Sequence, residues 1–474
     1  MKNFIRKTLA FLTAAVITVT AAVIPASAAD TKIKPGKNEA MTYVDSMGAG
    51  WNLGNAFDAV DKPEYTKSDE MQYETIWCGA KTTKELIKTV KKAGFKTIRL
   101  PVTWLNHVDK DFKISDKWMA RYKEVIDWCV EEGLYIIIDL HHDVYKGYYY
   151  PDKQNYETSK KYVKTIWKQV AETFKDYGEK VMFEVINEPR LTGTDYEWWY
   201  QQNPVPQEVQ ESLEIINELN QLMLDTIRET GGKNAKRYVL VGGYDTDGTE
   251  KGILSPYFKM PKDSVKNRLI AAVHFYGVGE RDGHRTLDGL YTNFTSKGIP
   301  VVITEYGLNS GGYKYLDNTE AAVKRMTDFG SYARERGISV VFWDNNYIRK
   351  GEKGHKLIDR ATAKVICPEI TKAFTTANKP AGLADSGKIS VKATASKNSV
   401  KLSWDKVKGA TKYAVYVNKG SKYECVSSKV TSNSYTVKSL KAGTKYKFYV
   451  RAFVNGKWTK VSQSKVTSVK TKSS

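Results

Sequence analysis

The stretch "VMFEVINEPR", residues 181–190, reads as a buried strand that ends in polar residues. A parallel strand covered on both faces is a near-continuous apolar run, so the two glutamates and the asparagine each need an explanation. Glu184 lies inside the run, and we expect it to be a buried structural charge held by an inward polar or basic group or by water. Asn187 and Glu188 stand at the carboxyl end, and we expect them to emerge at the rim of the sheet.

Seven further apolar runs repeat along the chain and alternate with helical periodicity. Two of the helical segments, "TTKELIKTVKKAG" (82–94) and "SDKWMARYKEVIDWCVEEG" (115–133), begin at Thr or Ser caps and end at glycine. The eight candidate strands are Met47 to Leu53, Lys96 to Val102, Tyr135 to His141, Val181 to Glu188, Tyr238 to Gly243, Leu269 to Tyr276, Pro300 to Tyr306 and Val340 to Asp344. Eight strands, each followed by a helix, predict an α/β chain with a closed (β/α)8 TIM barrel, and an open doubly wound sheet is the competing fold.

The pattern changes at "TTANKPAGLADSGK", residues 375–388, where small and turn-forming residues indicate a linker. We place the barrel at 41–378, the linker at 379–387 and a second domain at 388–474. Segments such as "KYAVYVNKG" and "TKYKFYVRAFVNG" alternate apolar and polar residues, which predicts a small all-β sandwich. Trp404, the strand with Tyr446 and Tyr449, and the "SLKAGTKY" turn resemble a fibronectin type III domain.

The first residues have the pattern of a secretory leader. Lys2, Arg6 and Lys7 precede an apolar run over 9–24, and the small residues 26–28 follow it. This predicts a signal peptide over 1–28, cut near Ala28 or Ala29, and a secreted, extracellular protein with no membrane attachment after cleavage. A retained membrane anchor is the alternative, although the run is short for a bilayer span.

The net charge of +21 is concentrated in the tail. Residues 388–474 carry 20 basic and 2 acidic side chains, whereas residues 30–387 carry 51 of each. A nucleic-acid enzyme would carry its positive field around its cleft, so this distribution argues against nucleic acid as a partner. The basic tail is either a solvated face or a weak binder of anionic polymer such as cell-wall material.

The cysteines and histidines do not indicate a metal centre or a disulfide framework. Cys78, Cys129, Cys367 and Cys425 have spacings typical of neither, so free or buried thiols are expected. In "DLHHD", residues 139–143, adjacent histidines on a strand would point to opposite faces and chelate poorly. We expect no metal and no organic cofactor.

Polar residues gather at the carboxyl ends of the predicted strands, where barrel enzymes build their active sites. They are Asn52, Asn55, Arg99, His141, His142, Asp143, Asn187, Glu188, His274, Tyr276, Glu305, Trp343 and Asp344. Glu188 and Glu305 form a carboxylate pair across one barrel mouth, the minimal machinery for glycosidic hydrolysis, with retention or inversion set by their separation. Arg99 and the Tyr276 hydroxyl would favour the ionised form of a nearby carboxylate, whereas the acid needs a raised pKa.

Aromatic side chains in the predicted loops suit the flat apolar faces of pyranose rings. We expect Trp77, Tyr149, Trp198 and Trp199 to serve as stacking platforms for sugars.

The ordered motifs resemble glycoside hydrolase family 5, in particular its subfamily rich in bacterial endo-β-1,4-glucanases. They are "GWNLGNAFDA", "KTTKELIKTVKKAGFKTIRLPVTW", "DLHHD", "NEPR", "HFYG", "TEYG" and "FWDN". The resemblance implies a retaining mechanism with Glu188 as acid/base and Glu305 as nucleophile. It further implies that Asn187 holds the sugar 2-hydroxyl, that Arg99 and Tyr276 orient Glu305, and that Trp343 floors subsite −1. His141 and His274 would line the cleavage point, and the remaining substrate contacts would be His142, Asn55 and Trp77.

One loop departs from the subfamily pattern: in "ETIWCGA", Trp77 matches and Cys78 does not. The resemblance nevertheless implies a secreted, monomeric endo-β-1,4-glucanase acting on β-1,4-glucan. Xyloglucanase, lichenase, xylanase or mannanase activity on the same barrel is the alternative, and a non-catalytic carbohydrate-binding protein is the alternative of another class.

Overall fold

The computed structural model describes residues 33–474 apart from 63–65, 199–201, 278–279, 308–317, 348–354, 381–388, 406, 408–409, 419, 421, 455–456, 460–463 and 474. The predicted leader and most of the predicted linker lie outside these residues. None of the described helices combines the length and the apolar character needed to cross a membrane.

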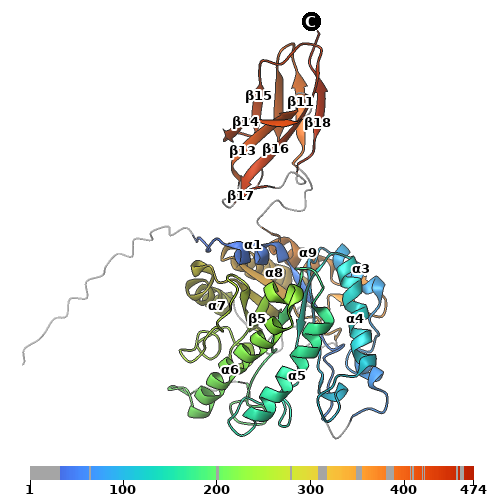
Figure 1. The fold of residues 1–474 in the computed structure, drawn as a ribbon, viewed down its shortest axis with the longest axis vertical. Helices are drawn as coiled ribbons and strands as arrows, with labels where there is room; N and C mark the ends of the chain where they lie inside the picture. The colour runs from blue at the N-terminus through green and yellow to red at the C-terminus, as the bar shows by residue number, and fades with distance from the viewer. Residues whose placement is uncertain are drawn as a thin grey trace, which may run out of the picture. The chain divides into compact units, whose positions relative to one another are not determined.

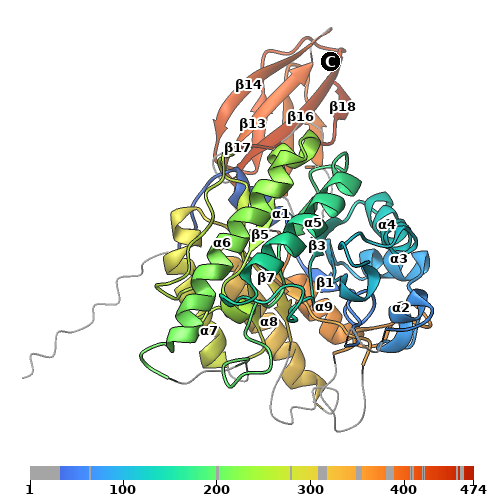
Figure 2. The same cartoon turned by 60° about the horizontal axis from the view of Figure 1, so that its bottom comes forward.

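Eight parallel strands close into a barrel in the order in which they occur along the chain. They are β1 (Gly50–Asn52), β2 (Thr97–Leu100), β3 (Tyr135–Asp139), β4 (Val181–Glu184), β5 (Val239–Val241), β6 (Leu269–Phe275), β7 (Val301–Tyr306) and β8 (Ile338–Phe342). The ring closes where β1 pairs with β8, with Gly50 opposite Val341. Figure 2 shows the strands inside a ring of helices. The predicted closed barrel is confirmed.

Helices follow every barrel strand except β5 and cover the outside of the barrel. They are α1 (Glu39–Met47), α2 (Tyr73–Ile76), α3 (Lys84–Lys92), α4 (Asp116–Glu131), α5 (Tyr156–Phe174), α6 (Gln207–Glu229), α7 (Glu280–Asn293), α8 (Thr319–Glu335) and α9 (Pro368–Ala377). In Figure 1, α5 and α6 run side by side along the outside of the barrel. The connection from β5 to β6, described throughout, contains only the short 3-10 turn η5 (Tyr244–Thr246). The prediction of a helix after every strand is therefore wrong at β5.

Capping explains where the predicted helices begin and end. The Thr83 side chain accepts a hydrogen bond from the Leu86 N–H at the start of α3, and Gly94 follows its end with φ +103°. Ser115 caps α4 in the same way, and Gly133 follows it with φ +66°. These caps satisfy backbone groups that the helix itself cannot pair.

Seven of the eight barrel strands end earlier than their apolar sequence predicts, and two of these ends move predicted site residues into loops. The β4 ladder stops at Glu184, so Asn187 and Glu188 belong to the loop that follows it. The last strand runs from Ile338 to Phe342, which places Trp343 beyond its end. Apolar character marks burial rather than ladder pairing, and the buried segment continues past each strand.

Two antiparallel sheets form the domain at the end of the chain. One contains β11 (Val391–Ala395), β12 (Val400–Trp404) and β15 (Ser434–Val437), and the other contains β13 (Ala410–Asn418), β14 (Tyr423–Val430), β16 (Lys445–Val454), β17 (Lys457–Trp458) and β18 (Thr467–Lys470). Trp404 packs edge-on against Tyr413 at 5.3 Å, and the Tyr446 hydroxyl accepts the Lys441 N–H at 2.9 Å. The second contact is the tyrosine corner of immunoglobulin-like sandwiches. The predicted sandwich is confirmed.

The described cysteines form no disulfide. Cys78, Cys129 and Cys367 are buried and Cys425 is exposed, all as free thiols. This matches the expectation from their spacing.

We predict that Gly50→Ala destabilises the barrel at its closing strand pair. A Cβ at this position would lie 2.7 Å and 2.8 Å from the two γ-carbons of Val341. Overpacking of this kind costs about 1–3 kcal/mol, which urea unfolding measures. Gly178→Ala, with open space around its Cβ, is the control and should leave the unfolding midpoint unchanged. If the clash is the cause, Gly50→Ala combined with Val341→Ala costs less than the sum of the two single changes.

Candidate active site

One buried arginine organises the floor of the site. The Arg99 side chain, on β2, is fully buried and meets three carboxylates: Asp139 at 2.7 Å, Glu184 at 2.5 Å and Glu305 at 2.7 Å. It also donates to Asn187 Oδ1 at 2.7 Å. Thr304 donates to the other oxygen of Glu184 at 2.8 Å. The prediction that Glu184 is a buried structural charge with an inward basic partner is confirmed.

Glu305, on β7, is held by two donors. Arg99 Nη1 donates to its Oε1, and the Tyr276 hydroxyl donates to its Oε2 at 2.6 Å. Each oxygen of the carboxyl therefore accepts one hydrogen bond, one from a charged donor and one from a hydroxyl. The side chain is only 4% exposed, so these bonds also fix its orientation. Such a carboxylate suits the role of nucleophile.

Glu188 has a different partner. Its Oε1 lies 2.8 Å from Nδ1 of His274, on β6, and Nδ1 is also 3.6 Å from Glu305 Oε2. Burial raises the pKa of Glu188, but the hydrogen bond and charge of His274, with Arg190, outweigh it and lower the pKa below its usual range. Burial opposes protonation of His274, yet Glu305 and Glu188 raise its pKa. In the free site the proton therefore resides on His274, and the raised pKa that an acid needs is absent from Glu188.

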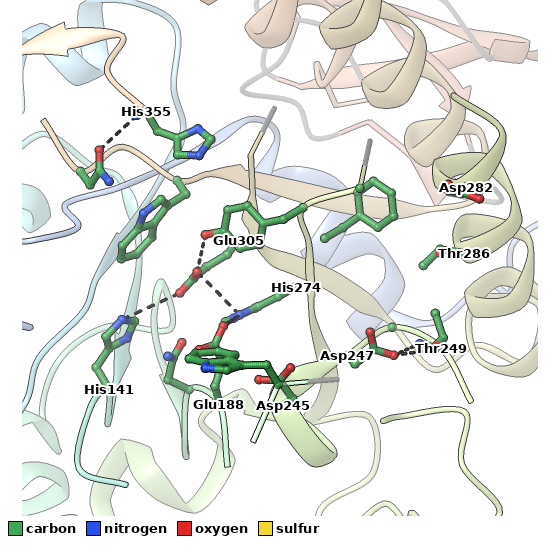
Figure 3. A pocket seen from close by; sticks show the side chains of 18 of the residues that line it. His141, Glu188, Asp245, Asp247, Thr249, His274, Asp282, Thr286, Glu305 and His355 are labelled. Carbon is green, nitrogen blue, oxygen red and sulfur yellow. Dashed lines mark hydrogen bonds and ion pairs between the residues drawn. The ribbon is translucent and has the colours of Figure 1, made fainter. Parts of the chain in front are cut away.

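The two candidate catalytic carboxylates face one another. One atom each of Glu188, His274 and Glu305 lies within 4.8 Å of the other two. Figure 3 shows His274 and both glutamates converging on one point, with His141 on one side and Asp245, Asp247 and Thr249 on the other. Such an arrangement places an acid and a nucleophile across a single bond.

His141 and His142 lie beyond the end of β3, which stops at Asp139, and their rings are in contact at 4.3 Å. The prediction that they point to opposite faces is therefore wrong, because strand alternation does not apply there. His141 Nδ1 pairs with Asp139 at 2.6 Å. Burial and the charge of Arg99 lower the pKa of His141 to about 3, so the ring is neutral and its Nε2 is free to accept a hydrogen bond.

Two groups of described side chains come close enough to hold a metal ion: Asp58 with His141 and His142, and Glu188 with His274 and Glu305. In the second group a direct hydrogen bond already joins His274 to Glu188. The second group fits proton exchange better than coordination, since the His274 nitrogen that faces the carboxylates carries the proton.

Trp343 forms one wall of the cavity beside Glu305. Its ring lies parallel to the His141 ring at 5.6 Å. Gly54 makes room for it, because a Cβ there would lie 2.7 Å from the indole. The cavity has a volume of about 840 Å³, and its lining includes His141, His142, Asn187, Glu188, Trp198, Asp245, Asp247, Thr249, His274, Tyr276, Asp282, Thr286, Glu305, Trp343, Asn345 and His355.

Comparisons with known proteins identify the family. Residues 60–348 match Cellulase (glycosyl hydrolase family 5). The chain belongs to glycosyl hydrolase family 5. It is a glycoside hydrolase, and residues 387–468 match a fibronectin type III domain. The first match identifies the family of the barrel, and the second identifies the domain at the end of the chain.

Several relatives cover most of the barrel. Endoglucanase A of Clostridium longisporum is 36% identical to this chain. The matched region covers 71% of this chain and 65% of the length of that protein. Endoglucanase A of Ruminococcus albus is 35% identical over 71% of this chain and 92% of its own length. A family 5 lichenase from Caldicellulosiruptor sp. F32 is 43% identical with a TM-score of 0.68, covering 73% of this chain and 97% of its own.

Some predicted site residues lie outside the main cavity of this family 5 hydrolase. Arg99 lies beneath it, and Asn55 offers its backbone N–H to Asp58 at 2.9 Å. Trp77 lines an adjoining cavity of about 400 Å³ with His142 and Arg190. His142 lines both cavities, so the cavity that Trp77 lines adjoins the main one.

Two predicted rim residues and one predicted stacking platform have structural positions instead. Asp143 is buried and accepts the Trp104 and Leu105 N–H groups and the Tyr162 hydroxyl. Asp344 is buried and accepts the Trp51 indole N–H at 2.9 Å. Tyr149 is fully buried, so the prediction that it is a stacking platform is wrong: its loop folds inward. Trp199 lies outside the described residues, whereas Trp198 is 46% exposed and lines the cavity.

Sequence reasoning missed the far half of the cavity. Asp245, Asp247 and Thr249 come from the loop after β5, and Asp282 and Thr286 from α7. The first three follow the predicted fifth strand closely, in "GGYDTDGT", so the rule that strand ends carry the site was a usable signal. The two α7 residues had no such signal.

We predict that the His274 imidazole of the free enzyme titrates above its usual range and that Glu188→Gln lowers its pKa. Removing the anion removes the charge that holds the proton, by about one pH unit or more. Proton and carbon NMR of histidine labelled at Cε1 follows all six rings. His107, whose pKa burial lowers to about 3, is the control and should not respond. An unchanged His274 midpoint in Glu188→Gln would contradict the assignment of the shared proton.

Proposed function

We propose that the enzyme is a secreted endo-β-1,4-glucanase that cleaves internal glucosidic bonds with retention. The observation that supports this most strongly is the approach of Glu188 and Glu305 to within 4.8 Å of each other. Retaining glycosidases hold their carboxyl groups about 5 to 5.5 Å apart, whereas inverting ones leave about 6.5 to 9.5 Å for a water molecule. The relatives named endoglucanases support the substrate class.

In the first step Glu305 attacks the anomeric carbon, and the bond from that carbon to the leaving oxygen breaks. The leaving oxygen takes the proton of Glu188, which receives it from His274 through their 2.8 Å contact. In the second step Glu188, now ionised, removes a proton from water, and the resulting hydroxide displaces Glu305 from the sugar. Arg99 and Tyr276 stabilise Glu305 as the departing anion.

The sugar in subsite −1 would rest on Trp343, with His141 Nε2 accepting a hydrogen bond from one of its hydroxyls and the Asn187 side-chain amide donating to another. Trp343 and His141 present parallel rings at this end of the cavity, which suits the flat face of a glucose unit. Because the solved relative at 43% identity is a lichenase, mixed-linkage β-glucan is the second candidate substrate.

We predict that Glu188→Gln and Glu305→Gln each lower turnover by several powers of ten while leaving the fold intact. The first loses the proton donor and the second loses the nucleophile. Reducing-sugar release from carboxymethylcellulose, lichenan, xyloglucan, xylan and mannan measures the loss. A chain that cleaves none of these polymers would refute the proposed function.

The stereochemical outcome is tested separately on the wild-type enzyme. Proton NMR of the first-formed product should show the β-anomer before mutarotation. Initial release of the α-anomer would exclude retention and leave the glucanase assignment in place. Glu184→Gln is not a suitable control, because Glu184 shares Arg99 with Glu305.

We predict that ending the chain at residue 387 leaves the turnover of soluble glucan within about twofold of the full chain. We propose that 41–378 is the catalytic domain, and Figure 3 draws the cavity from barrel residues alone. Adsorption to insoluble cell-wall polymer should weaken, since the removed segment carries the excess basic charge. A large loss on soluble glucan would mean that the tail completes the cleft.

A further inference from the structure

One face of the five-stranded sheet at the end of the chain lies opposite the core of its domain. In this sheet β13 pairs with β16, and Figure 2 shows the two strands side by side. Along β16 every second residue, such as Phe448, packs in the core. Because side chains alternate between the two faces of a strand, the residues between them point the other way. They are Lys445, Lys447, Tyr449, Arg451 and Phe453. We call the surface that these side chains occupy the outer face.

Three tyrosines cluster on the outer face. Tyr416, on β13, is directly opposite Tyr449, and their rings stack at 4.6 Å with an angle of 10° between their planes. Tyr423, on β14, meets Tyr449 edge-on at 4.8 Å. In the described part of the chain no hydrogen bond uses the three hydroxyls, and none of them is shielded from water. The cluster therefore presents hydroxyl groups to a ligand while its rings cover one another.

Basic side chains surround this cluster. Lys445 and Lys470, both exposed, stand directly opposite one another on β16 and β18. Like charges directly opposite on two strands destabilise a sheet. Lys447, also exposed, is the next outward residue along β16, and Arg451 follows Tyr449 on the same face. A bound anion would relieve the repulsion among these cations.

The outer face has no carboxylate of its own to do so. Residues 388–474 contain two acidic side chains, Asp405 and Glu424. Glu424 pairs with Val417, a core residue, and so lies on the inward side of its strand. Asp405 follows β12 in the other sheet. The positive charge of the outer face is therefore left for a partner.

We propose that the outer face binds a polysaccharide built from uronic acid units and holds the enzyme on that polymer. Each unit of such a polymer offers a carboxylate to the lysines and ring hydroxyls to the tyrosine hydroxyls. Charged donors bind carboxylates more strongly than neutral donors do. The proposal goes beyond the proposed function, which concerns the barrel, and it holds whichever glucan the barrel cleaves.

The arrangement of the rings favours a sugar acid over a nucleic acid. Proteins that bind single-stranded nucleic acid offer open aromatic faces on which bases stack, beside a basic groove. Tyr449 is only 6% exposed, because Tyr416 and Tyr423 cover it. Farther along the outer face, Lys412 lies over the ring of Phe453 at 4.6 Å. These covered rings leave hydroxyls and cations as the groups that recognise a ligand.

The test is isothermal titration of the full chain with polygalacturonate at low ionic strength, because salt screens exposed charges. We expect Lys447→Gln with Lys470→Gln to weaken binding about tenfold, through the loss of two exposed ion pairs with the polymer. Lys392→Gln with Lys401→Gln is the matched control. These two lysines are exposed on the three-stranded sheet, so the control pair removes the same charge elsewhere in the domain. Its affinity should stay within about twofold of that of the wild type.

Tyr416→Phe with Tyr423→Phe separates the hydroxyls from the ring packing. This pair keeps the aromatic cluster and should bind polygalacturonate roughly fivefold more weakly, since hydrogen bonds to the sugar are lost. Unchanged affinity would contradict the hydroxyl contacts on which the choice of a sugar rests.

Two other polymers test the chemical class of the ligand. Fully methyl-esterified polygalacturonate has the same sugar backbone without the charge, and we expect it to bind at least about tenfold more weakly. Single-stranded poly-dT should also bind more weakly than polygalacturonate. The proposal is overturned if the wild type does not bind polygalacturonate, if the ester or poly-dT binds as tightly, or if the control pair loses as much affinity as the outer-face pair. None of these measurements involves turnover, so their outcome is independent of whether the barrel cleaves glucan.

Discussion

The fully buried guanidinium of Arg99 is the constraint on which the site depends. One cation meets Asp139, Glu184 and Glu305 in the interior of the barrel, where an unpaired charge of either sign would be very costly. Three carboxylates around one arginine leave an excess of negative charge. Burial accordingly raises the pKa of Asp139 to about 6 and that of Glu184 as well, in spite of Arg99. The barrel core thus holds buried ionisable side chains as well as packed apolar ones.

This arrangement gives the two rim glutamates different chemistry. Glu305 accepts hydrogen bonds from Arg99 and Tyr276, which are donors that do not readily give up a proton. Glu188 receives His274, a donor that does exchange its proton near neutral pH. The roles that we propose for the two glutamates therefore rest on their hydrogen-bond partners and not on the depth of the residues. Arg99 contacts Glu305 directly, and it also holds Asn187, which precedes Glu188 in the chain.

The sequence predicts the barrel well because eight buried strands leave eight apolar runs, and capping residues mark the helices between them. It also leads to the two glutamates that we propose as the catalytic pair, since both end such runs. It fails where the backbone leaves regular structure. The burial of Tyr149, the ring contact of His141 with His142, and the turn that replaces a helix after β5 all depend on loop conformation. Periodicity carries no information about those loops.

The loop after β5 shows why the missed residues matter. A helix begun directly after β5 would draw residues 244–246 into regular φ and ψ values and away from the carbonyls of Asn187 and Pro189. The short turn instead accepts two left-handed residues and bonds them to the segment that carries Glu188. Aspartate at the first of these positions adds a second carboxyl to the cavity that Glu188 lines, which a glycine, although less strained, would not supply.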